Sequence, residues 1–256
     1  MALSATARPI AGAVATLGVS DRITFLRKTY AHLGGALVAF VLFTAGMMKF
    51  ATGLSLKLAI ARGNSMGTAL LVLLAFIAVS YGAQRLAMSD TSRGLQYLGL
   101  AVTVVLWSVL AQPIIWYTVI KFGATDVLTS GGTLLSAKAA MVLGEAAIVT
   151  IAIFVGLTLT VFYTKKDFSF LGGILSMAMW ALIGVVIASL IFGFNLGMIY
   201  SGIVIFLMGG YILYETSLVM KYFRPSMHVA AALMLFTTVI TLFIHVLRIL
   251  AEMNRR

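Results

Sequence analysis

The fold of this chain is decided by residues 196–250, which read LGMIYSGIVIFLMGGYILYETSLVMKYFRPSMHVAAALMLFTTVITLFIHVLRIL. The stretch contains two apolar runs, residues 196–220 and 228–250, and a short basic turn separates them. A helix needs about 20 mainly apolar residues to cross the ~30 Å hydrocarbon core of a bilayer. Each run is long enough, so the stretch predicts two neighbouring membrane-spanning helices.

Glu215 lies deep inside the first of these runs, within the string YILYETS of residues 211–217. A carboxylate at hydrocarbon depth costs ~2.5–3.5 kcal/mol on insertion scales, so such residues are rare and usually face a protein interior or a water-filled cavity. Glu215 is therefore the leading functional candidate, and the other segments are expected to surround it.

The composition extends this prediction to the whole chain. Of its 256 residues 62% are hydrophobic and only 10% are charged, whereas a soluble domain averages about 25% charged residues. We expect an all-α polytopic membrane protein with a polar tail (1–28), one transmembrane domain (29–250) and a basic tail (251–256). Its seven spans are predicted at residues 29–48, 66–83, 95–120, 137–162, 171–192, 196–220 and 228–250.

Other features exclude several classes of function. The chain has no cysteine, which excludes disulfides and thiolate metal sites. The net charge of +11 comes from Lys and Arg in loops and at helix ends and indicates membrane anchoring. These cations form no basic tract with interleaved aromatics, so no nucleic-acid partner is expected.

Serine-hydrolase and zinc-protease motifs are absent as well, so we expect neither an enzyme nor a cofactor. The loop cations narrowly favour an inside N-terminus.

Four polar residues recur along the last span. Thr238, Thr241, His245 and Arg248 are spaced by three, four and three positions, which places them on one helix face. This stripe is predicted to face Glu215 across a polar interior, where the carboxylate would titrate or bind a cation. Alternatively, the threonine hydroxyls bond their own backbone carbonyls and Arg248 extends to the membrane surface. His245 is either a pH-responsive group or a structural one.

Two more charged residues have two interpretations each. Glu145, in the fourth span, is either a second interior acid or a carboxylate near the helix start that pairs with Lys138. Arg85, which closes the second span, is either a surface anchor or a gating partner for an interior carboxylate.

Local signals add three structural expectations. Residues 49–62, with several cations, are predicted to form a loop between the first two spans. Pro113 is expected to kink the third span or to end its regular part. The fifth span, residues 171–192, is rich in small residues, which let helices approach closely in lipid.

Several strings together resemble one known family. They are FLRKTY at residues 25–30, YTKKDFSFLG at 163–172, YILYETS at 211–217, AAALMLFTTVITLF at 230–243 and LRIL at 247–250. In this order they resemble the Bax-inhibitor (transmembrane Bax-inhibitor-motif) family, in particular its bacterial-type seven-helix members. The resemblance covers nearly the whole chain from Asp21 onward.

The resemblance implies a seven-helix fold with the seventh helix central. In that family an acidic pair on helices six and seven forms a pH-sensitive latch that governs a calcium leak, and an arginine at the end of helix two engages it. Glu215 stands at the helix-six acid, Arg85 is the best match for the arginine, and Glu145 matches an acid of some bacterial members.

This chain departs from the pattern at Thr238, where the helix-seven acid is expected. Two adjacent carboxylates can share a proton and bind Ca²⁺ through hard oxygen ligands. A single carboxylate loses the like-charge repulsion and one ligand charge, so Glu215 is expected to be a weak Ca²⁺ ligand with a less steep pH response.

The departure also favours an alternative function, that of a non-conducting regulator. Such a protein would bind other membrane proteins, for example a membrane-bound AAA protease, to which bacterial relatives are linked. In both cases the resemblance implies a multi-pass protein in contact with lipid, in a bacterial inner membrane.

Overall fold

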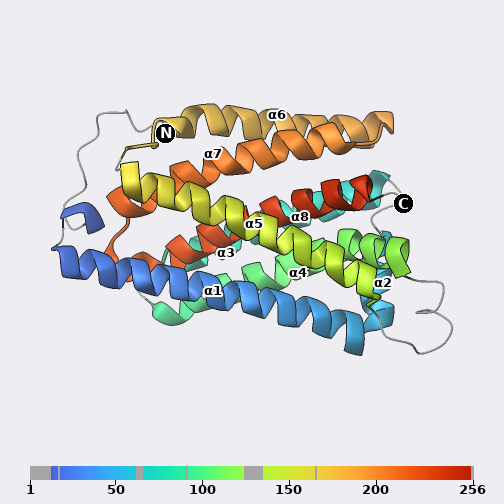
Figure 1. Cartoon of the computed structure of the whole chain (residues 1–256), viewed down its shortest axis with the longest axis horizontal. Coiled ribbons are helices and arrows are strands. Elements are labelled where there is room, and N and C mark those ends of the chain that lie inside the picture. Colours follow the sequence, from blue (N-terminus) through green and yellow to red (C-terminus); the bar gives the residue numbers. More distant parts are fainter. Residues whose placement is uncertain are drawn as a thin grey trace.

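The computed structural model describes residues 13–16, 18–61, 66–89, 92–123, 135–164 and 166–254. Within these ranges the chain is helical apart from short connections, and seven helices are long and apolar enough to cross a membrane, which confirms the all-α polytopic fold (Figure 1). The elements are η1 (Val14–Thr16), α1 (Val19–Phe50), α2 (Thr52–Ala61), α3 (Met66–Ala87), α4 (Arg93–Gly123), α5 (Ala137–Thr164), α6 (Leu171–Phe192), α7 (Met198–Tyr222), η2 (Pro225–Met227) and α8 (His228–Met253).

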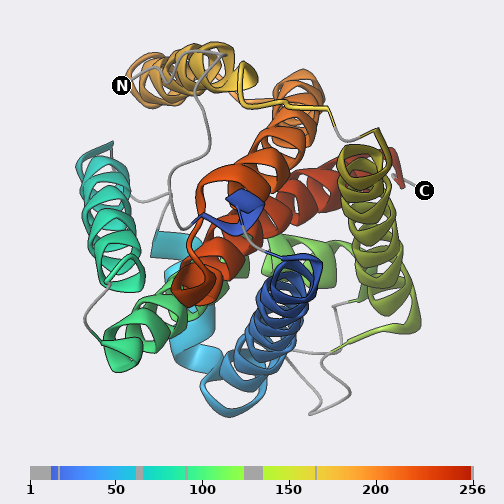
Figure 2. The same cartoon turned by 90° about the vertical axis from the view of Figure 1, so that its left-hand side faces the viewer.

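Helix α8, the seventh span, occupies the centre of the bundle. It packs against α1, α3, α4, α5 and α7, and the end-on view of Figure 2 shows it enclosed by them. Phe236, Leu242 and Leu247 on α8 are fully buried, because neighbouring helices pack against α8 on several sides. The central seventh helix is thus confirmed.

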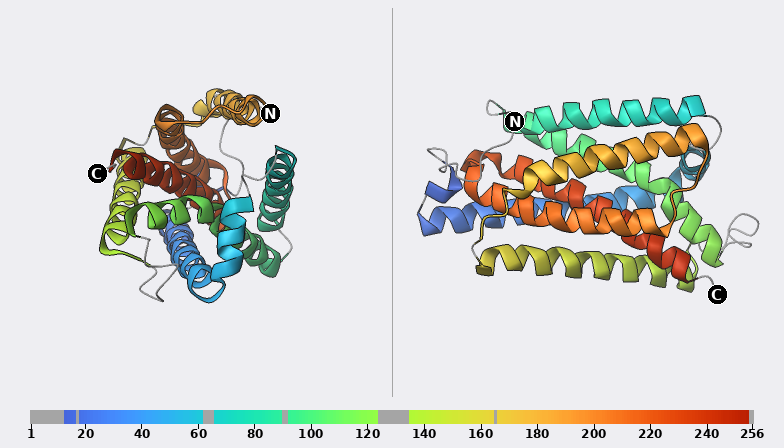
Figure 3. Two further views of the ribbon diagram at one scale, coloured as in Figure 1. Left: turned by 90° about the vertical axis from the view of Figure 1, so that its right-hand side faces the viewer. Right: turned by 90° about the horizontal axis from the view of Figure 1, so that it is seen from above.

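Helix α6 lies at the periphery, where it packs mainly on α7 and α3 (Figures 1 and 3). About half of its large side chains are exposed, among them Trp180 at 71%. Small residues let it approach α7, as expected: a side chain at Gly172 would lie 2.8 Å from the ring of Tyr214.

The helix boundaries differ from the predicted spans mainly at α1. This helix begins at Val19, so residues 19–28, placed in the polar tail by their composition, belong to it. Asp21 lies in the first turn, where a negative charge interacts favourably with the helix dipole. Residues 251–253, predicted as part of the basic tail, belong to α8. Of the rest of the predicted tails, residues 1–12, 17 and 255–256 lie outside the described residues.

The predicted loop between the first two spans was wrong for residues 52–61, which form helix α2. This short helix packs against α4 and α1 at one end of the bundle (Figure 3). Ser55 anchors it: its hydroxyl donates to Gln112 Oε1 (2.6 Å) and accepts from Trp116 Nε1 (2.7 Å). All three side chains are buried, so this network satisfies polar groups that have no access to water.

We expect Ser55→Ala to destabilise the protein by about 2–4 kcal/mol, because it leaves Gln112 Oε1 and Trp116 Nε1 buried without this partner, at ~1–3 kcal/mol each. Thermal unfolding in detergent measures the effect. Ser176→Ala, at an exposed position of α6, is the matched control and should change stability by less than about 0.5 kcal/mol. Equal melting temperatures for the two variants would contradict the anchoring role.

Pro113 does not end the third span. Helix α4 continues past it to Gly123, which is tolerated in spanning helices when neighbouring groups satisfy the freed backbone carbonyl. Pro113 also lines a cavity at the carboxyl end of α8.

Candidate functional site

Glu215 on α7 and Thr238 on α8 meet in the interior of the bundle. Both side chains are buried, at 6% and 4% exposure. The hydroxyl of Thr238 lies 2.8 Å from each carboxylate oxygen of Glu215 and donates to them. Among the described residues no ion pair joins Glu215 to a cation, so a hydroxyl is the principal polar partner of this carboxyl group.

This geometry accommodates two protonation states. An ionised Glu215 accepts the single hydroxyl hydrogen of Thr238 between its two oxygens. A neutral Glu215 donates its own hydrogen to Thr238 Oγ1 and accepts the threonine hydrogen at its other oxygen, since a hydroxyl both donates and accepts. Both states fit the same heavy-atom positions. Glu215 can therefore gain or lose a proton without a movement of either side chain.

A small cavity of about 90 Å³ adjoins Glu215. It lies between the last turns of α3 and the first half of α8, and Gln84, Glu215 and Thr237 supply its polar lining. A cavity of this size with several polar partners has room for water. Glu215 therefore borders a partly polar chamber on the side of the bundle where α3 ends.

Two further cavities lie along α8 beyond Thr238. One of about 240 Å³ is lined by Thr241 and His245 together with apolar residues of α3, α4 and α6. The other, of about 600 Å³, includes Arg248 and Glu252 at the carboxyl end of α8. Leu110 and Ile244 line both, so the two cavities adjoin. Chambers thus approach the Glu215–Thr238 pair from both ends of the bundle.

About one helical turn of α8 separates the chambers. Thr241 lines the cavity on one side and Thr237 the cavity on the other. The Thr241 hydroxyl donates to the Thr237 carbonyl (2.8 Å), as in the backbone-bonding alternative. Within α8, this turn lies between the two chambers, next to the Glu215–Thr238 pair.

The remaining stripe residues follow the same side of α8. His245 Nδ1 lies 3.2 Å from the hydroxyl of Ser201 on α7, and its ring packs against Tyr200 with centroids 5.7 Å apart. Arg248 is half-buried and lines the outermost cavity. The stripe thus runs from the Glu215 contact to the end of the helix.

The structure does not bring Arg85 or Glu145 to this site. Arg85 is exposed and donates from Nε and Nη2 to the hydroxyl of Tyr81, at 3.0 and 2.6 Å. Its neighbour Gln84 lines the Glu215 cavity instead. Glu145 is half-buried on α5 and lines neither the cavity beside Glu215 nor the one beside His245.

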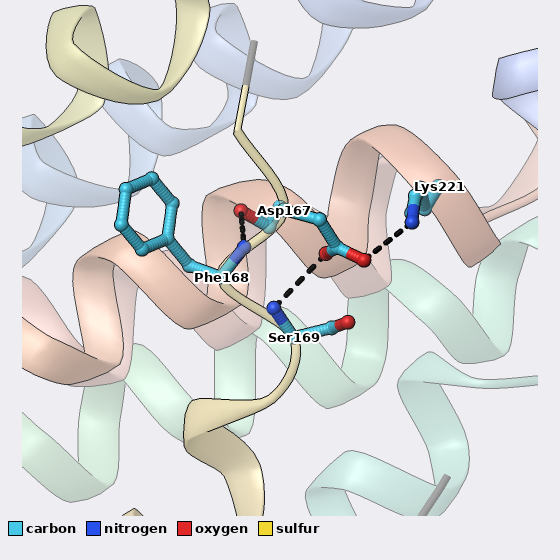
Figure 4. Close-up of polar contacts among 5 residues, drawn as sticks. Asp167, Phe168, Ser169 and Lys221 are labelled. Atoms are coloured by element: carbon cyan, nitrogen blue, oxygen red, sulfur yellow. Dashed lines mark hydrogen bonds and ion pairs between the residues drawn. The ribbon is translucent and has the colours of Figure 1, made fainter. Parts of the chain in front are cut away.

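The connection between α5 and α6 fixes the end of α7 that carries Glu215 (Figure 4). Lys221 pairs with Asp167, whose side chain also accepts from the Ser169 amide (3.0 Å). The Ser217 hydroxyl accepts from the Phe168 amide (3.2 Å), so it serves the loop and not the Glu215 contact. Partial burial acts to raise the pKa of the Asp167 carboxyl, but the bonds from Lys221 and Ser169 outweigh it and hold this pKa below its usual value.

Sequence reasoning missed three residues of this region: Ser201, Gln84 and Thr237. Ser201 precedes Glu215 by fourteen positions, close to four helical turns, so helical periodicity could have placed both on one face. Gln84 and Thr237 are the direct neighbours of Arg85 and Thr238. Periodicity alone does not decide which member of such a pair faces inward.

Among the described residues, seven apolar helices with one of them at the centre, and a carboxyl group buried beside it, define the class: an integral multi-pass membrane protein with a polar interior. The family model described as "Inhibitor of apoptosis-promoting Bax1" matches residues 22–256. The chain therefore belongs to the Bax inhibitor family.

Individual relatives are similar over part of the chain. Bax inhibitor 1 of Schizosaccharomyces pombe is 35% identical over 138 residues, which cover 52% of this chain and 50% of that protein. Protein lifeguard 4 of Mus musculus is 31% identical over 44% of this chain and 48% of its own length. An uncharacterized protein of Pseudomonas aeruginosa is 27% identical over 48% and 51%. The chain spans about half the length of each of these relatives.

Proposed function

We propose that this protein is a pH-sensitive leak channel for calcium and other cations, in which the carboxylate of Glu215 attracts and weakly binds the passing ion. The proposal rests on one observation above all: a buried carboxyl group, hydrogen-bonded among the described residues to the hydroxyl of Thr238, lies between chambers that approach from both ends of the bundle. Charged residues inside membrane proteins usually mark ion paths or proton relays. The protein would work without catalysis, in the inner membrane of a bacterial cell, and the ion would be cargo.

The oxygen atoms around Glu215 suit a weakly held hard cation. Ca²⁺ in strong sites takes six to eight oxygen ligands, several of them carboxylates. Here one carboxylate and the hydroxyls of Thr237 and Thr238 are at hand, with water filling the remainder. Weak binding suits conduction, because an ion must enter a site easily and also leave it.

The pH response follows from the charge of Glu215. An ionised carboxylate attracts a cation into the interior, and a protonated one does not. We therefore infer that the leak falls on acidification, as Glu215 takes up a proton. Arg85, bonded to Tyr81 at the end of the adjoining helix, would gate the path by reaching toward the chamber beside Gln84.

Reconstitution into liposomes tests the proposal. Vesicles that carry the protein and an entrapped calcium indicator should take up Ca²⁺ faster than protein-free vesicles, and faster at mildly alkaline than at mildly acidic pH. If vesicles with correctly inserted protein take up Ca²⁺ no faster than protein-free vesicles at every pH, the protein does not conduct calcium.

The alternative function, a non-conducting regulator, is favoured by the hydroxyl at Thr238, because the site lacks a second carboxylate that would strengthen calcium binding. Such a regulator would act by binding another membrane protein, for example a membrane-bound AAA protease. Tight vesicles together with co-purification of such a partner would support it over the channel.

A further inference from the structure

An apolar cavity lies away from the Glu215 site. It has a volume of about 430 Å³ and is formed by α1, α4, α5 and α8. Phe40 and Met48 on α1, Gly144 on α5 and Phe243 on α8 are part of its lining. The chambers beside Glu215 and His245 share none of these residues, so this cavity is separate from the proposed ion path.

Water is a poor occupant for this cavity. The lining is almost entirely hydrocarbon: the hydroxyl of Thr150 is bonded to the Ala146 carbonyl (2.7 Å), and that of Thr44 is buried beneath the surface. A water molecule needs two to four polar partners, and apolar cavities without them stay dry. An occupant must therefore be apolar.

The cavity is open on the side that faces lipid. Val41 and Ile151, on its rim, are 60% and 54% exposed, and both lie well inside spanning helices. Its length fits one leaflet: lining residues on α1 extend from position 37 to position 48. This interval corresponds to about 16 Å of helix, or half of the ~30 Å hydrocarbon thickness. One acyl chain of a membrane lipid has this reach.

Positive charge stands at the outer end of the cavity. Lys49 directly follows Met48, and Lys138 comes three residues after Leu135, both of which line the cavity. Both lysines are exposed at the end of the bundle where α1 finishes and α5 begins. A lipid whose chain enters here would bring its headgroup to the level of these cations, where an anionic phosphate is the complementary group.

We propose that the cavity between α1, α4, α5 and α8 binds one acyl chain of a membrane phospholipid, and that Lys49 and Lys138 attract its phosphate. The inner wall of the site is the turn of α8 that begins with Val239, the residue after Thr238. The bound chain would thus pack directly against the central helix at the depth of the Glu215 contact.

A photoactivatable phospholipid tests this site. The probe is a phosphatidylglycerol with a diazirine in the middle of one acyl chain, in phosphatidylethanolamine vesicles that contain the protein. Wild-type protein should be labelled on the segments of α1, α5 and α8 that line the cavity. In Gly144→Leu the new side chain projects into open space and fills the cavity. Labelling there should fall about tenfold, which corresponds to ~1.4 kcal/mol of lost affinity.

Gly156→Leu is the matched control. It makes the same change on the same helix, also in open space, but outside the lining of this cavity. Gel filtration and thermal unfolding establish that both variants fold. Unchanged labelling in Gly144→Leu, or an equal loss in Gly156→Leu, would overturn the chain site.

The headgroup part has its own test. The double variant Lys49→Gln, Lys138→Gln should reduce labelling by the phosphatidylglycerol probe and leave labelling by an uncharged diacylglycerol probe with the same diazirine chain unchanged. If both probes respond alike, the phosphate assignment is wrong and the site takes an uncharged lipid.

Discussion

Glu215→Gln is expected to lower calcium flux through reconstituted protein at least about tenfold at mildly alkaline pH, and to remove its dependence on pH. Two unit charges ~4 Å apart attract by about 4 kcal/mol at an effective dielectric constant of about 20. Losing a third of this energy at the rate-limiting position already slows entry about tenfold. Entrapped calcium indicator in proteoliposomes, read across the pH range, measures the effect.

Glutamine is a sharp replacement at this position because it changes charge and little else. Its amide oxygen can accept from the Thr238 hydroxyl and its NH₂ group can donate to it, as a neutral glutamic acid does. The variant therefore imitates the protonated protein at every pH. Its flux should match that of the wild-type protein under acidic conditions.

Glu145→Gln is the control for this experiment. It removes the same charge from the half-buried position on α5, outside the chambers at Glu215 and His245. We expect wild-type flux and a wild-type pH response. An equal loss in both variants would mean that Glu145 belongs to the path, as the second-acid interpretation of the sequence holds; no loss in Glu215→Gln would remove Glu215 from the mechanism.

The number of spans was predictable because each crossing of the hydrocarbon core requires an apolar run of about 20 residues, which is visible in the sequence. The fifth span was expected at residues 171–192 and α6 has these bounds, since lipid surrounds most of it and its composition alone decides its length. Helices with polar ends gave larger differences. The first ten residues of α1 carry Asp21, Arg22, Arg27 and Lys28, so hydropathy could not distinguish a helix that leaves the membrane from a tail.

Helix α2 was missed for a different reason. Residues 52–61 are too short to span a bilayer and contain Lys57, which made a loop the natural prediction. The helix is stabilised by tertiary contacts, chiefly the bonds of Ser55 with Gln112 and Trp116. These partners are 57 and 61 positions away along the chain, and no local pattern reveals them.

At the candidate site, the sequence indicated the residues but not their pairing. The spacing of Thr238, Thr241 and His245 put them on one face, yet only Thr238 contacts Glu215, while Thr241 bonds its own backbone and His245 contacts Ser201. Residues that share one face of a helix can still contact different neighbours, because the face is wider than a single side chain. The angle at which α7 crosses α8 decides which residue of the stripe meets the carboxylate.

Thr238→Asp is expected to raise calcium affinity about tenfold or more and to make the pH response steeper. The substitution puts a second carboxylate where a hydroxyl now lies 2.8 Å from both oxygens of Glu215. Two hard, charged ligands bind Ca²⁺ more tightly than one, because affinity in calcium sites follows the ligand charge. Without calcium, the two groups repel each other and share a proton, so their titrations are coupled. Calcium titration of the purified protein, followed by flux in liposomes, measures both effects.

Thr238→Asn separates charge from shape in that experiment. Asparagine has the size of aspartate and can still bond Glu215, but it adds no charge, so calcium affinity should stay within about twofold of the wild-type value. Thr241→Asp adds the charge one turn away, in the chamber beside His245, without reaching the Glu215 contact. If Thr241→Asp raises affinity as much as Thr238→Asp, the interior responds to net charge alone. An effect confined to Thr238→Asp means that the ion is held between α7 and α8, at the point where Thr238 contacts Glu215.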